Sequence, residues 1–238
     1  DRSPSRGLGD VYKRQSNAFL ATKISFINEI ANLCEKTGID VKDISFGMGS
    51  DQRIGDRFLR AGPAYGGSCF PKDTRALIDI GKKFNTNLSI VKSVILSNEK
   101  RRLLSIKKVI QIVNNNFTNK IITFLGVTFK PNTDDMREAS SISMIKYLNK
   151  KKCKIRYYDP SGEKVEFKNL KNVNYYQDMR NACFNSDLII LHTEWNEFKS
   201  LNFKKLVKKR NFKVYDMRNL YSPEKMKKSN IKYFGIGR

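Results

Sequence analysis

The sequence predicts an α/β protein in which a helical segment precedes a parallel β-sheet with helices on both faces. Up to about residue 117, apolar residues recur every three or four positions, the spacing of one stripe of an α-helix. From Lys120 onward, short β-rich runs alternate with helical stretches, a pattern typical of parallel sheets. We therefore divide the chain into residues 1–15, a helical domain at 16–117 and an α/β domain at 118–238.

Residues 1–15 differ from the rest of the chain. They are polar, carry Gly and Pro, and lack the apolar periodicity that begins at Ser16. We expect this segment to be a disordered or foreign leader.

The helical domain opens with a stripe of apolar residues that ends near Gly38. Its members are Leu20, Ile24, Ile27, Ala31 and Cys34. We expect a second short helix at Val41–Gly47, a loop-rich stretch at 51–67 and a helix at 71–80 that stops at Gly81. A long helical pattern then runs from Ile90 to Val113. It has more apolar surface than the short helices before it can cover, so a second domain or a partner subunit is the expected cover.

The α/β domain contains four predicted strands, at 121–126, 154–159, 188–192 and 212–216. Helices are expected between them at 143–151, 178–184 and 203–209. In such sheets ligands bind beyond the carboxyl ends of the strands. Those ends carry the segments 129–131, 159–160, 192–194 and 216–218.

The usual dinucleotide fingerprint is missing from this sequence. No strand is followed by G-x-G-x-x-G with an acidic residue about 20 positions further on. The isolated pairs Gly7/Gly9 and Gly235/Gly237 are too short a signal to count.

A net charge of +23 and a pI near 9.9 raise the possibility of nucleic-acid binding. However, the lysines are scattered along the chain in an Asn- and Ile-rich background. We interpret most of them as solvated surface charges, with some available for an anionic substrate. We expect no nucleic-acid partner.

The four cysteines form no C-x-x-C pair and are too few for a disulfide scaffold, so we expect a reduced, cytoplasmic protein. No apolar run reaches 18 residues, and no signal-peptide pattern is present, so membrane association is not expected. The single histidine, His192, has no Cys or His neighbour and predicts no metal site.

The most informative stretch is Gly66-Gly-Ser-Cys-Phe-Pro-Lys-Asp73. Pro71 suits the first turn of a helix, which puts Cys69 at the positive end of a helix dipole with Lys72 close by. Both features favour thiolate over thiol. The two glycines permit positive φ and leave room for a substrate to approach the sulfur. Local chemistry favours a reactive thiol and a buried structural cysteine about equally, because free cysteine is often buried.

Three stretches together resemble the UDP-glucose/GDP-mannose dehydrogenase family. They are residues 17–29, residues 66–73, and Phe129-Lys-Pro131 with Arg137. The resemblance covers about residues 16–238, in family order and spacing. It implies a helical dimerisation domain followed by a Rossmann-like domain that binds a nucleotide sugar, in a homodimer or a higher homo-oligomer.

The resemblance also implies a reaction. Family members oxidise the C6 alcohol of a nucleotide-linked sugar to a carboxylate, using two NAD⁺. Cys69 matches the thiolate that attacks the aldehyde-level intermediate and becomes a thioester, which water hydrolyses. Asp73, Asn17 and Lys13 match an aspartate, an asparagine and a lysine that surround an ordered water. Without the resemblance, Asn17 would be interpreted as a helix N-cap and Asp73 as an acid in a first helical turn.

Further residues match family positions that contact the ligands. The resemblance implies that Arg53 reaches a substrate across a dimer interface and that Lys72 and Arg137 contact NAD. The other implied substrate contacts are Phe58, Leu59, Arg60, Tyr65, Gly66, Lys130 and Arg218. Arginine suits the two phosphates of a UDP-sugar because it binds such groups bidentately. Taken alone, each basic residue would be interpreted as a solvated surface charge.

Family members begin with an NAD-binding domain of about 200 residues, which this sequence does not match, so the chain resembles the carboxy-terminal half. We expect the chain alone to turn over no UDP-glucose, and production of NADH by it would contradict this. Three alternatives remain open: a dehydrogenase for GDP-mannose or a UDP-N-acetylhexosamine, a non-catalytic module that binds a nucleotide sugar and dimerises, and a basic nucleic-acid binder.

Overall fold

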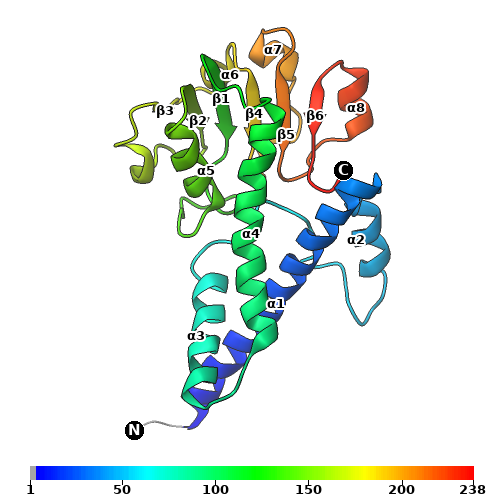
Figure 1. Ribbon diagram of the computed structural model, residues 1–238, viewed down its shortest axis with the longest axis vertical. Helices are drawn as coiled ribbons and strands as arrows, with labels where there is room; N and C mark the ends of the chain where they lie inside the picture. Colours follow the sequence, from blue (N-terminus) through cyan, green and yellow to red (C-terminus); the bar gives the residue numbers. More distant parts are fainter. Residues whose placement is uncertain (1–3) are drawn as a thin grey trace.

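A computed structural model describes residues 4–238, and its long helix α4 (Ser89–Ile112) joins two regions (Figure 1). The helical region contains α1 (Pro4–Thr37), α2 (Val41–Gly49) and α3 (Phe70–Lys83). α1 packs against both α3 and α4. The β-sheet lies at the far end of α4, where the end of the chain also returns toward α1 and α2 (Figure 1).

The helix α1 begins at Pro4, well before the predicted start at Ser16. The expectation of a disordered leader is therefore wrong from Pro4 onward, while residues 1–3 lie outside the described part of the chain. Once a helix is nucleated, each further residue adds a hydrogen bond, so it extends without an apolar stripe of its own. Pro4 suits this end because the N–H that proline lacks would have no partner in a first turn.

The ends of the short helices differ from prediction by about two residues. α2 is capped by Asp40, whose side chain accepts a hydrogen bond from the Lys42 backbone N–H, and it continues to Gly49. α3 continues past Gly81 to Lys83. Gly81 lies within the helix, at a position where a side chain would meet the Thr86 carbonyl and Leu88.

The sheet has six parallel strands in the order β3-β2-β1-β4-β5-β6. The four predicted strands are confirmed as β1 (Lys120–Leu125), β2 (Cys153–Tyr158), β4 (Leu188–Leu191) and β5 (Lys213–Asp216). β3 (Val173–Tyr175) and β6 (Lys232–Phe234) were not predicted, because three residues are too few to show a period. The order reverses between β1 and β4, and ligands of such sheets bind at this reversal.

Helices cover both faces of the sheet, as the sequence predicted. α5 (Ser140–Asn149), α6 (Met179–Cys183), α7 (Phe203–Val207) and α8 (Pro223–Lys228) lie between or beyond the strands. Two short 3₁₀ helices occupy Val165–Phe167 and Asn196–Phe198. Two hydrophobic cores result. One joins α4 and α5 to the inner side chains of β1, β2 and β4, and the other joins α7 and α8 to the opposite face.

The second half of α4 belongs to the sheet's core. Ile106, Val109 and Ile112 pack in the same cluster as Ile122 of β1. The second domain therefore covers this half of α4, one of the two covers that the sequence predicted. In the first half, Leu96 and Leu103 remain exposed, and their cover by a partner subunit stays a prediction.

Candidate functional site

Cys69 is the N-cap residue of α3, and its side chain is exposed. The other three cysteines, Cys34, Cys153 and Cys183, are buried. The Cys69 sulfur lies 3.7 Å from the Ser68 hydroxyl oxygen. The alternative of a buried structural cysteine is thus wrong for Cys69. An exposed sulfur at the positive end of a 14-residue helix is accessible to an electrophile.

Asp73 lies one helical turn after Cys69 and is almost fully buried, with 1% of its surface exposed. The Asn17 side-chain N–H donates to one carboxylate oxygen at 2.6 Å, and the Lys72 ammonium donates to the other at 2.5 Å. Burial acts to raise the pKa of Asp73, but the bonds from Lys72 and Asn17 outweigh it and hold the pKa below its usual value. The structure therefore brings Asn17 and Asp73 together as predicted.

Asn17 is not a helix N-cap, because α1 begins 13 residues earlier, at Pro4. Lys13 lies in the same helix and is exposed. The ion pair with Asp73 is made instead by Lys72, the residue that the sequence assigned to the cofactor. Arg14 contributes a further positive charge, which helps to lower the pKa of Asp73. The ion pair between Lys72 and Asp73 was not predicted, and the family roles of Lys13 beside an ordered water and of Lys72 toward NAD stay predictions.

The buried Asp73 carboxylate predicts a specific loss of stability in acid. Because its pKa is lower in the folded than in the unfolded chain, Asp73 stabilises the fold above about pH 4. This contribution is lost as the pH falls through the folded-state pKa. In the Asp73→Asn variant we expect a smaller decrease of unfolding temperature between pH 5 and about pH 3. Thermal melts of both proteins check this, with Asp79→Asn, an exposed acid of the same helix, as the control.

Gly66 and Gly67 are needed for packing against the second domain. A Cβ at Gly66 would lie 2.5 Å from the Glu138 carbonyl oxygen, and one at Gly67, whose φ is +80°, would lie 2.7 Å from the Phe129 ring. Both contacts are too close for any side chain. The loop that follows β1 fills the space beside both glycines. Gly66 also lines the cavity described below, and the expectation that the glycines leave room for a substrate to reach the sulfur stays a prediction.

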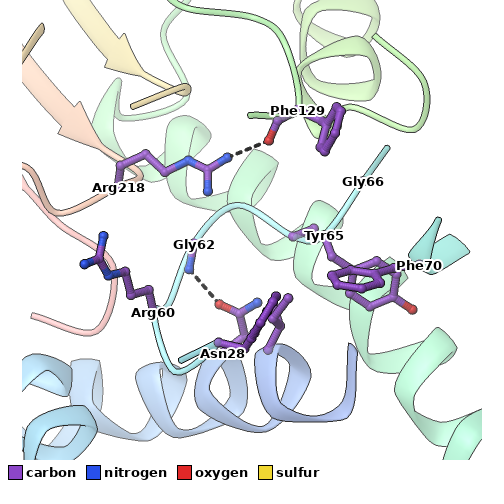
Figure 2. A pocket seen from close by; sticks show the side chains of 11 residues that line it. Asn28, Arg60, Gly62, Tyr65, Gly66, Phe70, Phe129 and Arg218 are labelled. Atoms are coloured by element: carbon purple, nitrogen blue, oxygen red, sulfur yellow. Dashed lines mark hydrogen bonds between the residues drawn. The ribbon is translucent and has the colours of Figure 1, made fainter. Parts of the chain in front are cut away.

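A cavity of about 270 Å³ lies beside this turn, between the helical region and the carboxyl ends of the strands (Figure 2). Five predicted substrate residues line it: Phe58, Arg60, Tyr65, Gly66 and Arg218. The remaining lining residues are Ile24, Asn28, Gly62, Ala64, Phe70 and Phe129. Asn28 was missed as a candidate although it lies in the stretch 17–29 that carries the family resemblance. Its residue type alone gave no sign that it faces a cavity.

Buried polar side chains fix the loop that forms one wall of the cavity. Asn28 accepts a hydrogen bond from the Gly62 N–H at 2.8 Å, as Figure 2 shows. Asn98 of α4 binds both backbone groups of Tyr65, at 2.9 and 3.1 Å. Arg101 of α4 donates to the Gly62 carbonyl at 2.9 Å. Because buried polar groups are costly to leave unpaired, these bonds make the wall rigid.

Arg218 brings a positive charge to the cavity from the end of β5. Its guanidinium donates to the His192 carbonyl at 2.8 Å. It also donates to the Phe129 carbonyl at 3.0 Å, the bond drawn in Figure 2. Burial lowers the pKa of Arg218, and the nearby Glu194 and Asp216 oppose that shift. Arg60, which precedes Gly62 in the loop, also lines the cavity and is exposed. The cavity thus has two guanidinium groups and several aromatic rings.

The other predicted ligand contacts lie outside this cavity. Arg53 is 89% exposed and forms an ion pair with Asp51 at 2.6 Å, while Leu59 is buried in the core. Lys130 is exposed, with its ammonium 5.4 Å from the Phe129 ring centre. Arg137 is exposed and pairs with Asp135 at 2.8 Å. The predicted roles of these residues toward substrate or NAD stay predictions.

Within the described part of the chain, no cluster of His, Cys, Asp or Glu has the size of a metal site. The same residues contain no helix of the length and apolarity that a membrane crossing requires.

Two family models match this chain. The central domain of the UDP-glucose/GDP-mannose dehydrogenase family matches residues 9–100, and the UDP binding domain of the same family matches residues 123–223. The first match begins inside the segment that was expected not to match. It includes Cys69 and the residues around Asp73.

Curated proteins and solved structures agree with these matches. The chain is 40% identical to a UDP-glucose 6-dehydrogenase of Rhizobium meliloti over 98% of its length and 54% of the relative's. It is 42% identical to a UDP-glucose 6-dehydrogenase of Rickettsia conorii, covering 96% of this chain and 54% of the relative. A UDP-glucose dehydrogenase structure from Pyrobaculum islandicum superposes with a TM-score of 0.82 at 30% identity, over 95% of this chain and 50% of that one.

The chain therefore spans about half the length of the relatives it matches. Its two family matches follow the order of the helical region and the sheet. The motifs, the fold and the matches agree, and the chain belongs to the UDP-glucose/GDP-mannose dehydrogenase family.

Proposed function

We propose that this chain provides the catalytic thiol and the sugar-nucleotide site of an NAD-dependent UDP-glucose 6-dehydrogenase. The observation that carries the proposal is the position of Cys69. Its sulfur is exposed, the Asn17–Asp73 pair lies one helical turn away, and its neighbours Gly66 and Phe70 line a cavity with two arginines.

The cavity suits a nucleoside diphosphate sugar. Arg60 and Arg218 supply cationic donors for two phosphate groups. The rings of Phe58, Tyr65 and Phe70, which pack edge to face at about 6 Å, offer apolar surface to a sugar or a base. UDP-glucose is the proposed substrate because the curated relatives named above carry that activity.

Only two NAD contacts are proposed among the described residues of this chain. The sequence has no dinucleotide fingerprint, and the two proposed NAD contacts, Lys72 and Arg137, are paired with Asp73 and Asp135. In the proposed reaction two NAD⁺ would supply the oxidising power for each sugar, each by accepting one hydride. The steps below concern the chain's own groups.

The Cys69 sulfur adds to the carbonyl carbon of the C6 aldehyde, which makes a thiohemiacetal. Oxidation of that carbon gives a thioester, and water then cleaves the carbon–sulfur bond, which releases a carboxylate and returns the thiolate. Asp73 is an ionised carboxylate one helical turn after Cys69, and we assign it the role of accepting a proton from the attacking water. Asn17 keeps the carboxylate oriented through its bond to Oδ2.

Arg60→Ala tests the proposed UDP site. Loss of a charged hydrogen-bond donor is expected to weaken UDP binding by about tenfold or more. Isothermal titration calorimetry on the chain measures this. The neighbouring Arg57→Ala is the matched control, because Arg57 is also exposed but does not line the cavity. Uridine, which lacks phosphates, should bind the wild type and Arg60→Ala equally.

The same titrations separate the competing functions. Binding of GDP with higher affinity than UDP would favour a GDP-mannose dehydrogenase. Absence of UDP binding by the wild type at millimolar concentration would contradict the proposed function. Equal UDP affinity of the wild type and Arg60→Ala would remove Arg60 from the site.

We also propose a homodimer or higher homo-oligomer in a reducing cytoplasm. Four exposed apolar residues of α1 recur every seven positions, which places them on one stripe: Tyr12, Phe19, Phe26 and Leu33. Leu96 and Leu103 of α4 repeat the same interval. A second copy of the chain would bury this surface. A reducing compartment fits a nucleophile that must remain a free thiol.

A further inference from the structure

Glu138 ends the loop that follows β1 and connects the two regions of the protein. One of its carboxylate oxygens accepts a hydrogen bond from Arg75 of α3 at 3.0 Å, and the other accepts one from Arg102 of α4 at 3.0 Å. Arg102 also donates to the Glu138 carbonyl at 3.0 Å. One residue of the sheet domain therefore holds two helices of the helical domain.

The backbone of Glu138 is in the left-handed region, with φ of +53°. A non-glycine residue rarely adopts this conformation, and it persists only where the surroundings hold it. The two arginines provide that restraint. Burial acts to raise the pKa of Glu138, but the bonds from Arg75 and Arg102 outweigh it and lower the pKa, so the carboxylate is ionised at neutral pH.

The restrained backbone meets the cysteine turn directly. The Gly67 N–H donates to the carbonyl of Arg137, the residue before Glu138, at 2.8 Å. The Glu138 carbonyl itself is packed so closely on Gly66 that no side chain fits there. Gly67 is two residues before Cys69. The position of the sulfur therefore depends on the conformation that Glu138 holds.

The opposite end of the same loop lies at the cavity. Phe129 lines the cavity, packs its ring on Gly67 and accepts a hydrogen bond from Arg218. The cysteine turn thus rests on both ends of one loop, at Phe129 and at Glu138. None of the residues that the sequence singled out is Glu138 or either of its arginine partners.

We infer that Glu138 is a positioning residue, which clamps the cysteine turn between the sugar-nucleotide domain and helices α3 and α4 and so sets the reactivity of Cys69. This inference rests on the proposed function of Cys69 as the nucleophile. The carboxylate carries the role, because it is the group that joins both arginines. The left-handed backbone is the conformation that this charge network maintains.

The test compares Glu138→Gln with the wild-type 238-residue chain. Glutamine keeps the size of the side chain but removes its charge. We expect amide hydrogen exchange across residues 66–69 to become about tenfold faster, the effect of losing one ion-paired hydrogen bond. The rate of Cys69 alkylation by iodoacetamide should change severalfold, while UDP affinity should stay within about twofold because the cavity arginines are untouched. Glu163→Gln is the matched control, because Glu163 is an exposed acid of the same domain with its own lysine partner.

Two more variants separate the role of the carboxylate from that of the backbone and replace Glu138→Gln if it does not fold. Glu138→Gly relieves the left-handed strain but lacks the carboxylate, so it should show the same fast exchange as Glu138→Gln. Arg75→Ala removes the partner that is about half exposed and is the safer variant if Glu138→Gln does not fold. It should show the same change in exchange, to a smaller degree.

The inference would be overturned if Glu138→Gln showed the exchange and alkylation rates of the wild type. It would also be overturned if Glu138→Gly behaved like the wild type, because that result would assign the role to the backbone alone. A lower unfolding temperature with unchanged exchange at 66–69 would show a merely structural residue. The proposed function has a separate test, and it is contradicted if the wild-type chain does not bind UDP. In that event the exchange comparison still decides the role of Glu138.

Discussion

Iodoacetamide is expected to alkylate Cys69 at least about a thousandfold faster than any other cysteine of the folded chain. The thiolate is the reacting species, and it must also be accessible. Cys69 is exposed, whereas Cys34, Cys153 and Cys183 are buried. Burial raises the pKa of Cys153 to about 11 and that of Cys183 to about 12. At pH 8, about one Cys153 thiol in a thousand or fewer is ionised, even before its inaccessibility is counted.

Mass spectrometry of the intact chain and of its tryptic peptides measures this directly. The wild type should gain one carbamidomethyl group, on the peptide that contains Cys69, and Cys69→Ser should gain none over the same time. In guanidinium chloride, the wild type should gain four groups and Cys69→Ser three, which proves that every thiol is intact. Rapid labelling of a second cysteine in the native protein would contradict the described burial and, with it, the selectivity that the proposed mechanism requires.

The position of Cys69 at the start of a helix could be predicted because its signals are local, although local chemistry favoured a reactive and a buried thiol about equally. A helix N-terminus, its capping residue and the lysine three positions later are all adjacent in the sequence. The same is true of β1, β2, β4 and β5, whose patterns lie within four to six residues: β4 is an unbroken buried apolar run, and in β2 buried residues alternate with the more exposed Lys154 and Arg156. In both cases the signal and the structure occupy the same short stretch.

The residues that pair with one another in the site are far apart in the sequence, and the sequence predicted these pairs less well. Asn17 and Asp73 are 56 residues apart and were paired through the family resemblance, not through any pattern between them. The arginine partners of Glu138 lie 63 and 36 residues away, on two different helices. The local sequence around Glu138 does not predict that both of its carboxylate oxygens accept hydrogen bonds from helices of the other domain.

Lys72 shows that, in a chain this rich in lysine, residue type alone does not identify which lysine contacts Asp73. The family resemblance placed Lys13 near Asp73 and assigned Lys72 to NAD. In the structure the adjacent Lys72 forms an ion pair with Asp73. Gly66 and Gly67 also show that a contact distant in the sequence could not be predicted from the residues themselves. Their positions were recognised, but the group that fills the space beside them comes from a loop about 60 residues later.

His192 lies at the reversal of the sheet order, at the end of β4, and is 1% exposed. One ring nitrogen lies 2.8 Å from the Ser140 hydroxyl and the other 3.2 Å from the Thr193 hydroxyl. Its backbone carbonyl accepts the hydrogen bond of Arg218. A second positive charge is disfavoured there: burial lowers the pKa of His192 to about 3, and the charge of Arg218 adds to the effect.

The low pKa of His192 predicts that the free energy of unfolding decreases in mild acid. In the unfolded chain the imidazole takes up a proton near pH 6.5, whereas in the folded chain it stays neutral until about pH 3. Between these values the unfolded state binds one proton more, so the unfolding free energy decreases by about 1.4 kcal/mol for each pH unit, or about 2 kcal/mol at pH 5. Urea unfolding between pH 7 and pH 5, where carboxylates are still largely ionised, measures this slope.

Because His192 is the single histidine of the chain, its ring proton signals in NMR are unambiguous. They should keep the chemical shift of a neutral imidazole from pH 8 to pH 5. In His192→Gln, which preserves hydrogen-bonding capacity without a titrating group, the slope of unfolding free energy between pH 7 and pH 5 should nearly vanish. A ring that titrates near pH 6.5 in the folded protein would mean that solvent reaches the end of β4. The carbonyl of His192 would then be a poor support for Arg218, and the cavity would lose the rigid cation on which the proposed phosphate binding depends.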